Sequence, residues 1–109
     1  MFVKNRDSNE LAQWLKAETP PHFIDVRTPQ EMAQASIHNG KPLPLNTLPV
    51  RMPEVPTDKQ VVFDCRTGAR SAQACMFLAL QGYDNVYNLY GGIVSWARNG
   101  LPIAPIASA

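Results

Sequence analysis

A short apolar run, followed at once by a compact loop and then by a helical pattern, constrains this chain more than any other feature. Residues 61–64 predict a buried strand, and residues 71 to about 81 predict a helix. The connection between them is Cys65-Arg66-Thr67-Gly68-Ala69-Arg70. Cys65 therefore lies where a strand ends and a helix begins, the edge at which parallel sheets bind ligands.

This loop is suited to hold an anion. The first amides of a helix have no partner within the helix, and a tight turn ahead of them points further N–H groups inward. Arg66 and Arg70 add positive charge, and Gly68 supplies the backbone freedom that such a turn needs. A thiolate is favoured there over a thiol, so Cys65 is the predicted nucleophile. The Asp64 carboxylate would oppose a thiolate, but we expect it to project to the opposite face from Cys65.

A packed apolar role is the alternative for a cysteine in a small protein. Two arginines and a glycine within the next five positions favour the reactive interpretation of Cys65. Cys75, inside the predicted helix, is interpreted as a small core residue, with a resolving or regulatory role left open. Both thiols are expected to stay reduced. His22 and His38 lack ligand-like spacing to each other and to the cysteines, so neither a metal nor a cofactor is predicted.

Helices and strands alternate before the loop. A capping signal at residues 7–10, followed by an apolar stripe, predicts a first helix. Residues 22–26 predict a short buried strand. Thr28 and Pro29 begin a second helix, which is expected to end near Ser36.

The pattern continues to the end of the chain. Residues 38–60 hold five of the ten prolines and predict a surface connection, with one short strand near residues 43–45 and one helical turn. Residues 86–89 predict another strand, Gly91-Gly92 a tight turn and residues 93–99 a short helix. Alternating strands and helices favour an α/β fold with a parallel sheet covered on both faces.

Size and charge narrow the classes of function. A chain of 109 residues forms one domain, and a net charge of +1 gives no reason to expect nucleic acid or a membrane as the main partner. The first residues contain no apolar stretch of signal-peptide length, and no run approaches a membrane span. We therefore expect a cytoplasmic protein.

Three segments, in this order, resemble the signatures of the rhodanese domain family. They are Phe23-Ile24-Asp25-Val26-Arg27 with Pro29 and Glu31, then Cys65 to Arg70 with the helix that follows, and finally Leu89-Tyr90-Gly91-Gly92-Ile93 with Trp96, Gly100 and Pro102. The first segment departs from the family, which has an aromatic residue and then Gly-His-Ile where this chain has Met32 and Ala35-Ser36-Ile37. Ala35 is compatible with a slightly longer helix at this point.

The resemblance implies a fold and a domain organisation. The fold would be rhodanese-like, with a central, mostly parallel five-stranded sheet and helices on both faces. Residues 1–109 would form a single rhodanese domain, with an ordered core from about residue 5 to residue 104 and a short C-terminal tail. Asp25 and Arg27 would be structural charge partners near the loop. Trp14 and Trp96 are expected to anchor the core.

The resemblance also implies sulfur transfer through a persulfide on Cys65, without a cofactor. The rest of the loop, Arg66, Thr67, Gly68, Ala69 and Arg70, would bind the substrate. The donor would be a small anion such as thiosulfate, or a persulfide, and the acceptor a thiol or cyanide. A protein could also act as the donor or the acceptor.

Two alternatives remain. One is a persulfide carrier or interaction module that delivers sulfur to a protein partner through the same loop. The other is a phosphatase or arsenate reductase of related architecture. Such phosphatases typically place five residues between cysteine and arginine, whereas four separate Cys65 from Arg70. The smaller loop suits one sulfur atom better than a tetrahedral phosphoryl group.

Overall fold

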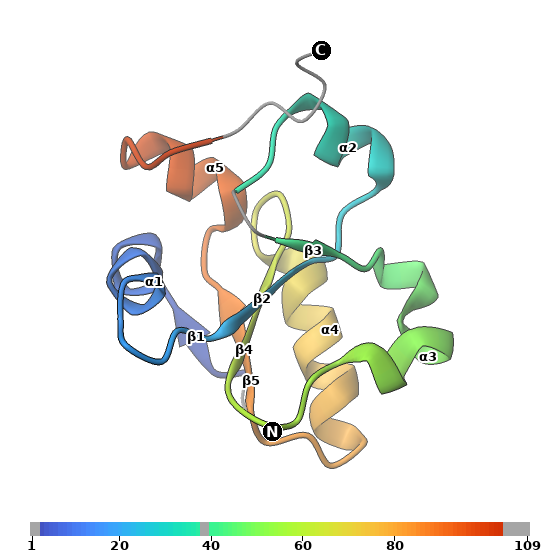
Figure 1. The fold of residues 1–109 in the computed structure, drawn as a ribbon. Helices are drawn as coiled ribbons and strands as arrows, with labels where there is room; N and C mark the ends of the chain where they lie inside the picture. The colour runs from blue at the N-terminus through green and yellow to red at the C-terminus, as the bar shows by residue number, and fades with distance from the viewer. Residues whose placement is uncertain (1–2, 38–39, 104–109) are drawn as a thin grey trace.

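The computed structural model describes residues 3–37 and 40–103, which form a five-stranded sheet in the order β1-β5-β4-β2-β3 (Figure 1). Every neighbouring pair in this sheet is parallel. The strands are β1 (Asn5–Arg6), β2 (His22–Asp25), β3 (Lys41–Pro42), β4 (Val61–Asp64) and β5 (Val86–Leu89). The predicted five-stranded parallel α/β fold is thus confirmed.

Five α-helices lie in the described residues, and the first two begin at their capping signals. They are α1 (Ser8–Leu15), α2 (Pro29–Gln34), α3 (Leu48–Arg51), α4 (Ala69–Leu80) and α5 (Gly92–Arg98), and 3-10 turns at Leu45–Thr47 and Met52–Glu54 flank α3. Asp7 caps α1 and Thr28 caps α2, each in a capping box with the glutamate three residues later. Pro29 occupies the first turn of α2, as expected.

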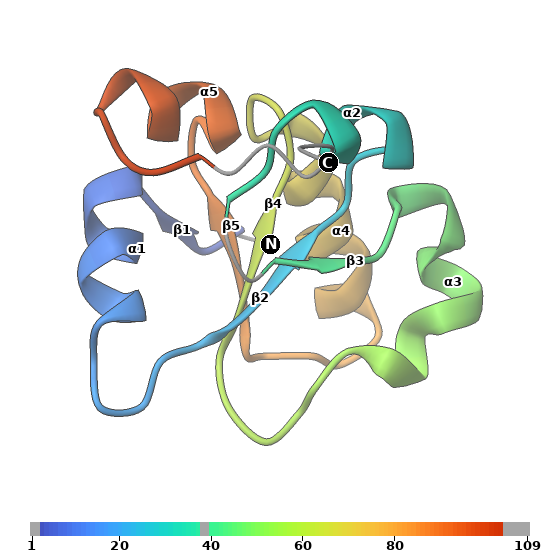
Figure 2. The same ribbon diagram turned by 45° about the horizontal axis from the view of Figure 1, so that its top comes forward.

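Two helical layers cover the sheet (Figure 2). α1 and α5 lie on one face, and α3 and α4 lie on the other. The first layer includes Leu11, Leu89, Ile93 and Trp96 in one apolar cluster, and the second includes Phe63, Ala74, Cys75 and Leu78 in another. All four residues of β4 are buried because this central strand is covered on both sides.

The predicted strands at 22–26, 61–64 and 86–89 and the helix at 93–99 are confirmed to within a residue. The short strand expected near residues 43–45 lies two residues earlier, because the pairing with β2 falls at Lys41–Pro42. β1, which has no apolar residue, was not predicted at all. The helix after the loop begins at Ala69, two residues earlier than expected.

The second helix ends earlier than its sequence predicted. α2 stops at Gln34, and Ala35 is extended, with φ −168° and ψ 148°. The reason is a tertiary contact, since the Ala35 carbonyl accepts a hydrogen bond from the Arg27 guanidinium at 2.8 Å. The longer helix proposed for Ala35 is therefore wrong. Over residues 3–37 and 40–103, no helix has the length and apolar character needed to cross a membrane.

Candidate functional site

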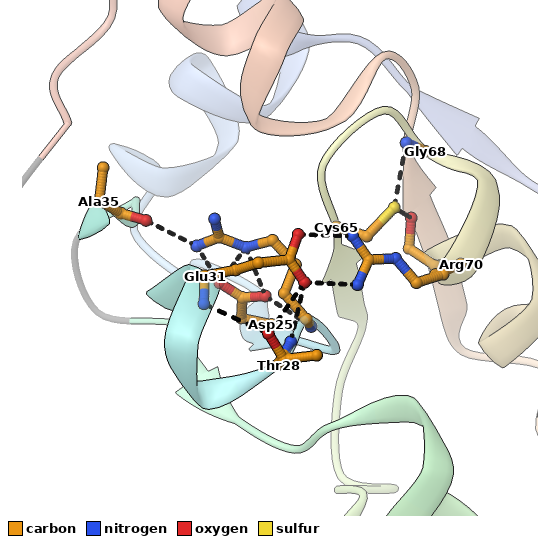
Figure 3. A network of polar contacts seen from close by, with 9 residues as sticks. Asp25, Thr28, Glu31, Ala35, Cys65, Gly68 and Arg70 are labelled. Carbon is orange, nitrogen blue, oxygen red and sulfur yellow. Dashed lines mark hydrogen bonds and ion pairs between the residues drawn. The ribbon is translucent and has the colours of Figure 1, made fainter. Parts of the chain in front are cut away.

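The Cys65 sulfur lies at the centre of the strand-to-helix loop (Figure 3). β4 ends at Asp64, and α4 begins directly after Gly68, which adopts φ +101°. This conformation turns the Gly68 N–H toward the sulfur, with a nitrogen-to-Sγ distance of 3.0 Å. The Ser71 Oγ lies 3.2 Å from the same sulfur, and Cys65 is only 1% exposed. Two hydrogen-bond donors at the start of a helix are thus directed at one buried sulfur.

The first residues of α5 hold the backbone of the Cys65 loop by hydrogen bonds and close packing. The Ile93 N–H donates to the Cys65 carbonyl at 2.9 Å, and the Val94 N–H donates to the Arg66 carbonyl at 3.1 Å. Gly92, at φ +60°, packs so closely that a Cβ on it would lie 2.4 Å from the Arg66 oxygen. The glycine pair of the C-terminal signature therefore holds the loop backbone in place.

The predicted binding residues differ in their surroundings. Arg66, Thr67 and Ala69 are exposed, while Gly68 is buried against β5 and the turn after it. Arg70 is not free, because its guanidinium forms a bidentate ion pair with Glu31 of α2, at 2.6 and 2.8 Å. Of the two arginines expected to add positive charge, Arg70 is thus paired with a carboxylate, whereas Arg66 is exposed.

Glu31 serves two structures at once. Its carboxylate accepts from the Thr28 backbone in the capping box and from Arg70 across the site. The hydrogen bonds from Arg70, followed by those from Thr28, lower the pKa of Glu31 to about 2. The ion pair thus connects α2 to the loop.

Asp25 and Arg27 form the structural pair that the resemblance implied. The guanidinium donates to both carboxylate oxygens at 2.7–3.1 Å, and the Arg27 backbone N–H donates to the same carboxylate. Arg27 is 4% exposed, so its charge is paired with Asp25 inside the protein.

Asp64 is fully buried, and neither of its carboxylate oxygens has a hydrogen-bond partner among the described residues. Desolvation, followed by the nearby Asp25, raises the pKa of Asp64 well above its usual value. The neutral acid is therefore favoured, which reduces the repulsion that Asp64 would otherwise exert on a Cys65 thiolate.

Cys75 is a buried residue of α4, as expected, and desolvation raises its pKa to about 12. It is thus a poor nucleophile near neutral pH. His22 pairs with Asp58 at 2.9 Å, and His38 lies outside the described residues. Residues 3–37 and 40–103 contain no group of three or more potential metal ligands.

The two tryptophans have structural contacts. Trp96 is buried, and its indole N–H donates to the Pro102 carbonyl at 2.8 Å. Trp14 is half-buried and packs edge-on against Tyr87, with 5.2 Å between ring centroids. Both contribute to the apolar layer formed by α1 and α5.

A groove of about 350 Å³ lies next to the loop, between α2 and α5. The residues that line this groove include Arg66, together with Glu31 of α2 and Val94 and Ala97 of α5. The exposed Arg66 therefore reaches a space in which a small anionic molecule fits.

Sequence reasoning did not assign a site role to Ser71 or Asn88. Ser71 Oγ contacts both the Cys65 sulfur and the Asn88 side chain, and Ser71 and Asn88 are 0% and 4% exposed. The available signal was a polar residue within an otherwise apolar strand, Asn88 among Val86, Tyr87 and Leu89.

Known proteins resemble this chain over most of its length. A sulfurtransferase from Allochromatium vinosum is 50% identical over 102 residues, which cover 94% of this chain and 95% of that protein. Thiosulfate sulfurtransferase GlpE from Vibrio cholerae is 32% identical over 92 residues, which cover 84% of this chain and 87% of that protein. A rhodanese-related protein from Thermoplasma volcanium has a crystal structure that matches with a TM-score of 0.86 and 31% identity, over 94% of this chain and 99% of that one. The family model of the rhodanese-like domain matches residues 7–99, and the chain belongs to this family.

Proposed function

We propose that this protein is a sulfurtransferase that accepts a sulfane sulfur on Cys65 and passes it to a nucleophilic acceptor. The observation that carries the proposal is the buried Cys65 sulfur with the Gly68 N–H directed at it, 3.0 Å away, at the start of α4. Sulfurtransferases of similar length, at up to 50% identity, support the same reaction class.

The reaction divides into two displacements. The Cys65 thiolate attacks the outer sulfur of thiosulfate, a new S–S bond forms on Cys65, and sulfite leaves with the electron pair of the broken bond. An acceptor thiolate or cyanide then attacks the outer sulfur, and the Cys65 thiolate leaves. Neither step needs an external oxidant or reductant.

The loop residues have separate parts in this proposal. The Gly68 N–H and the first amides of α4 stabilise negative charge on the sulfur. The exposed Arg66 attracts an anionic donor and the departing sulfite, because its guanidinium matches oxyanions. Thr67 and Ala69 form the exposed rim of the loop, and Arg70 contributes to anion binding only when it is released from Glu31.

The donor is proposed to be thiosulfate or a persulfide, since the Vibrio relative is named a thiosulfate sulfurtransferase. The acceptor is a thiol, cyanide or a protein partner. A carrier that delivers sulfur only to a protein uses the same first step, so the two steps must be measured separately.

Intact-mass spectrometry after incubation with thiosulfate tests the proposal. We expect a gain of about 32 Da on the native protein, removed by cyanide with release of thiocyanate. Cys65→Ser abolishes the gain, whereas Cys75→Ser, a matched change at the other buried thiol, retains it. Loading without release to cyanide indicates the carrier. If neither thiosulfate nor a persulfide donor loads Cys65, sulfur transfer at this loop is refuted, and hydrolysis of phosphate esters or reduction of arsenate is tested next.

A further inference from the structure

A chain of three polar side chains extends from the Cys65 sulfur into the protein. Ser71 Oγ lies 3.2 Å from the sulfur and also contacts the Asn88 Oδ1. The Asn88 Nδ2 donates to the Asn5 Oδ1 at 3.0 Å, and Asn5 is an exposed residue of β1. The chain therefore connects the reactive sulfur to solvent at the far edge of the sheet.

One hydroxyl proton must serve two acceptors. Ser71 Oγ carries a single hydrogen, while both Cys65 Sγ and Asn88 Oδ1 lie within hydrogen-bond distance of it. When Cys65 is a thiol, its S–H can donate to Ser71 Oγ, and Ser71 donates to Asn88. When Cys65 is a thiolate, the sulfur can only accept, so the Ser71 proton must turn toward it.

Asn88 can follow this change. A side-chain amide presents an oxygen or an NH₂ to the same neighbour by rotating half a turn. With its Nδ2 toward Ser71, Asn88 donates to the serine oxygen and leaves the hydroxyl proton free for the sulfur. Its Oδ1 then faces Asn5, whose exposed amide can rotate in turn. Each arrangement satisfies every polar atom of Ser71 and Asn88.

We propose that Ser71, whose hydroxyl proton is shared between Cys65 and Asn88, is a positioning residue that directs this proton to the Cys65 sulfur when the sulfur is negatively charged. The catalytic role of Ser71 rests on the proposed function. In that function the same hydrogen bond stabilises the Cys65 thiolate before it attacks the donor, and again when the acceptor removes the outer sulfur and the thiolate is released. The ionisation effect itself is measurable without any sulfur donor.

Burial strengthens the effect of the Ser71 hydroxyl on the charge of the Cys65 sulfur. Ser71 and Asn88 are removed from water, so no solvent molecule replaces the hydroxyl when it is deleted. A hydrogen bond to a charged group is the stronger kind, so its loss shifts the equilibrium between thiol and thiolate by about tenfold.

The other titratable groups around the loop do not differ between the variants compared. They are Asp64 on β4, Asp25 on β2, Arg27 just after β2, Glu31 on α2, Arg66 in the loop, and Arg70 and Cys75 on α4. β5 and α5 present neutral groups, Asn88 and Ile93, to the loop. A difference between variants therefore reports the Ser71 proton.

The test is the pH dependence of Cys65 alkylation by iodoacetamide, followed by peptide mass. Ser71→Ala is expected to shift the midpoint of the pH profile of alkylation upward by about one unit and to leave the limiting rate at high pH unchanged. Asn88→Leu, which removes the competing acceptor at similar volume, is expected to react at least as fast as the wild type. In the double variant the rate should equal that of Ser71→Ala, because Asn88 acts only through Ser71.

Ser8→Ala is the matched control. Ser8 is also buried at a helix start, but it lies on α1, across the sheet from α4, and should leave alkylation unchanged. A midpoint for Ser71→Ala within about 0.3 unit of the wild type overturns the proposal. So does an equal slowing by Asn88→Leu, because a general packing defect would act in that way.

A measurement on the unmodified protein removes any dependence on folding of the variants. The side-chain amide signals of Asn88 in ¹⁵N NMR should titrate with the midpoint of Cys65 alkylation. Those of Asn85, which is fixed to the Pro56 and Lys59 carbonyls, should not. An Asn88 signal that stays constant while Cys65 ionises refutes the rotation. If thiosulfate loads none of the proteins while the alkylation results hold, the proposed donor fails and this inference stands.

Discussion

Gly92 allows a sharp test of how closely α5 must approach the loop. A Cβ at this position would lie 2.4 Å from the Arg66 oxygen and 2.6 Å from the Cys65 oxygen. Both neighbours are backbone atoms, so no side chain can rotate away. Gly100→Ala is the matched control, because Gly100 has a similar φ of +72° and nothing within 4 Å of an added Cβ.

The two substitutions share one cost and differ in another. An alanine in the left-handed region costs about 1–2 kcal/mol at either site. At Gly92 the contact must also open from 2.4 Å to the 3.4 Å of an ordinary contact, a shift of 1.0 Å. Forcing extra atoms into a packed site adds about 1–3 kcal/mol. We therefore expect a loss of about 1–2 kcal/mol for Gly100→Ala and about 2–5 kcal/mol for Gly92→Ala.

Urea unfolding measures the stability difference, and the rate of persulfide formation measures the site. A 1 Å displacement at a reacting group can cost about a hundredfold in rate. Gly92→Ala should therefore load sulfur about a hundredfold more slowly, while Gly100→Ala stays within about twofold of the wild type. Equal stability losses and equal loading rates for the two variants would show that the loop does not depend on this close approach.

Three further changes test the site and its surroundings. Glu31→Gln keeps the capping box but frees Arg70, so the KM for thiosulfate should fall in steady-state assays. The pKa of Glu31 is about 2 in the folded protein and 4.5 in the unfolded chain, so ionised Glu31 stabilises the fold. In urea titrations above about pH 4.5, Glu31→Gln should be about 1 kcal/mol less stable than the wild type, and this difference should vanish as the pH falls to about 2. Asp64→Asn should raise the free energy of unfolding more at pH 8 than at pH 5, since a raised folded-state pKa makes the native acid increasingly costly as the pH rises; an equal change at both values would contradict this. Trp96→Phe should cost about 1 kcal/mol in urea unfolding by removing the hydrogen bond to Pro102, and an unchanged midpoint would argue against it.

Local signals explain why most elements could be predicted. The capping box of α2 is contained in the four consecutive residues from Thr28 to Glu31, and the mostly apolar run of β4 is contained in four others, Val61–Asp64. β1 carries no such signal, since Asn5 and Arg6 are polar and become a strand only by pairing with β5. The leucine-rich stretch after β3 predicted a strand that begins two residues too late. Leu43 is buried and its N–H donates to the Asp25 carbonyl of β2, but the strand itself is Lys41–Pro42.

The candidate site likewise has one part that could be predicted from the sequence and one part that could not. The Cys65 loop is contiguous, so its residue types and spacing could be interpreted directly. The contacts that modify it come from distant parts of the chain: Glu31 is 39 residues from Arg70, and Asn88 is 17 residues from Ser71. These partners follow from the sheet order and the packing of α2, which the sequence alone does not fix.

The distribution of charge around the loop bears on what stabilises an anion there. Arg70 is matched by Glu31, and the neutral form of Asp64 is favoured, so Arg66 is the exposed cation of the loop itself. The Gly68 N–H, by contrast, is fixed by the backbone 3.0 Å from the sulfur, in a place that water does not reach. Fixed dipoles in a dry site lose little to screening, whereas an exposed guanidinium loses much. The backbone N–H groups should therefore stabilise the negative charge on the Cys65 sulfur, and Arg66 should mainly attract the anionic sulfur donor to the loop.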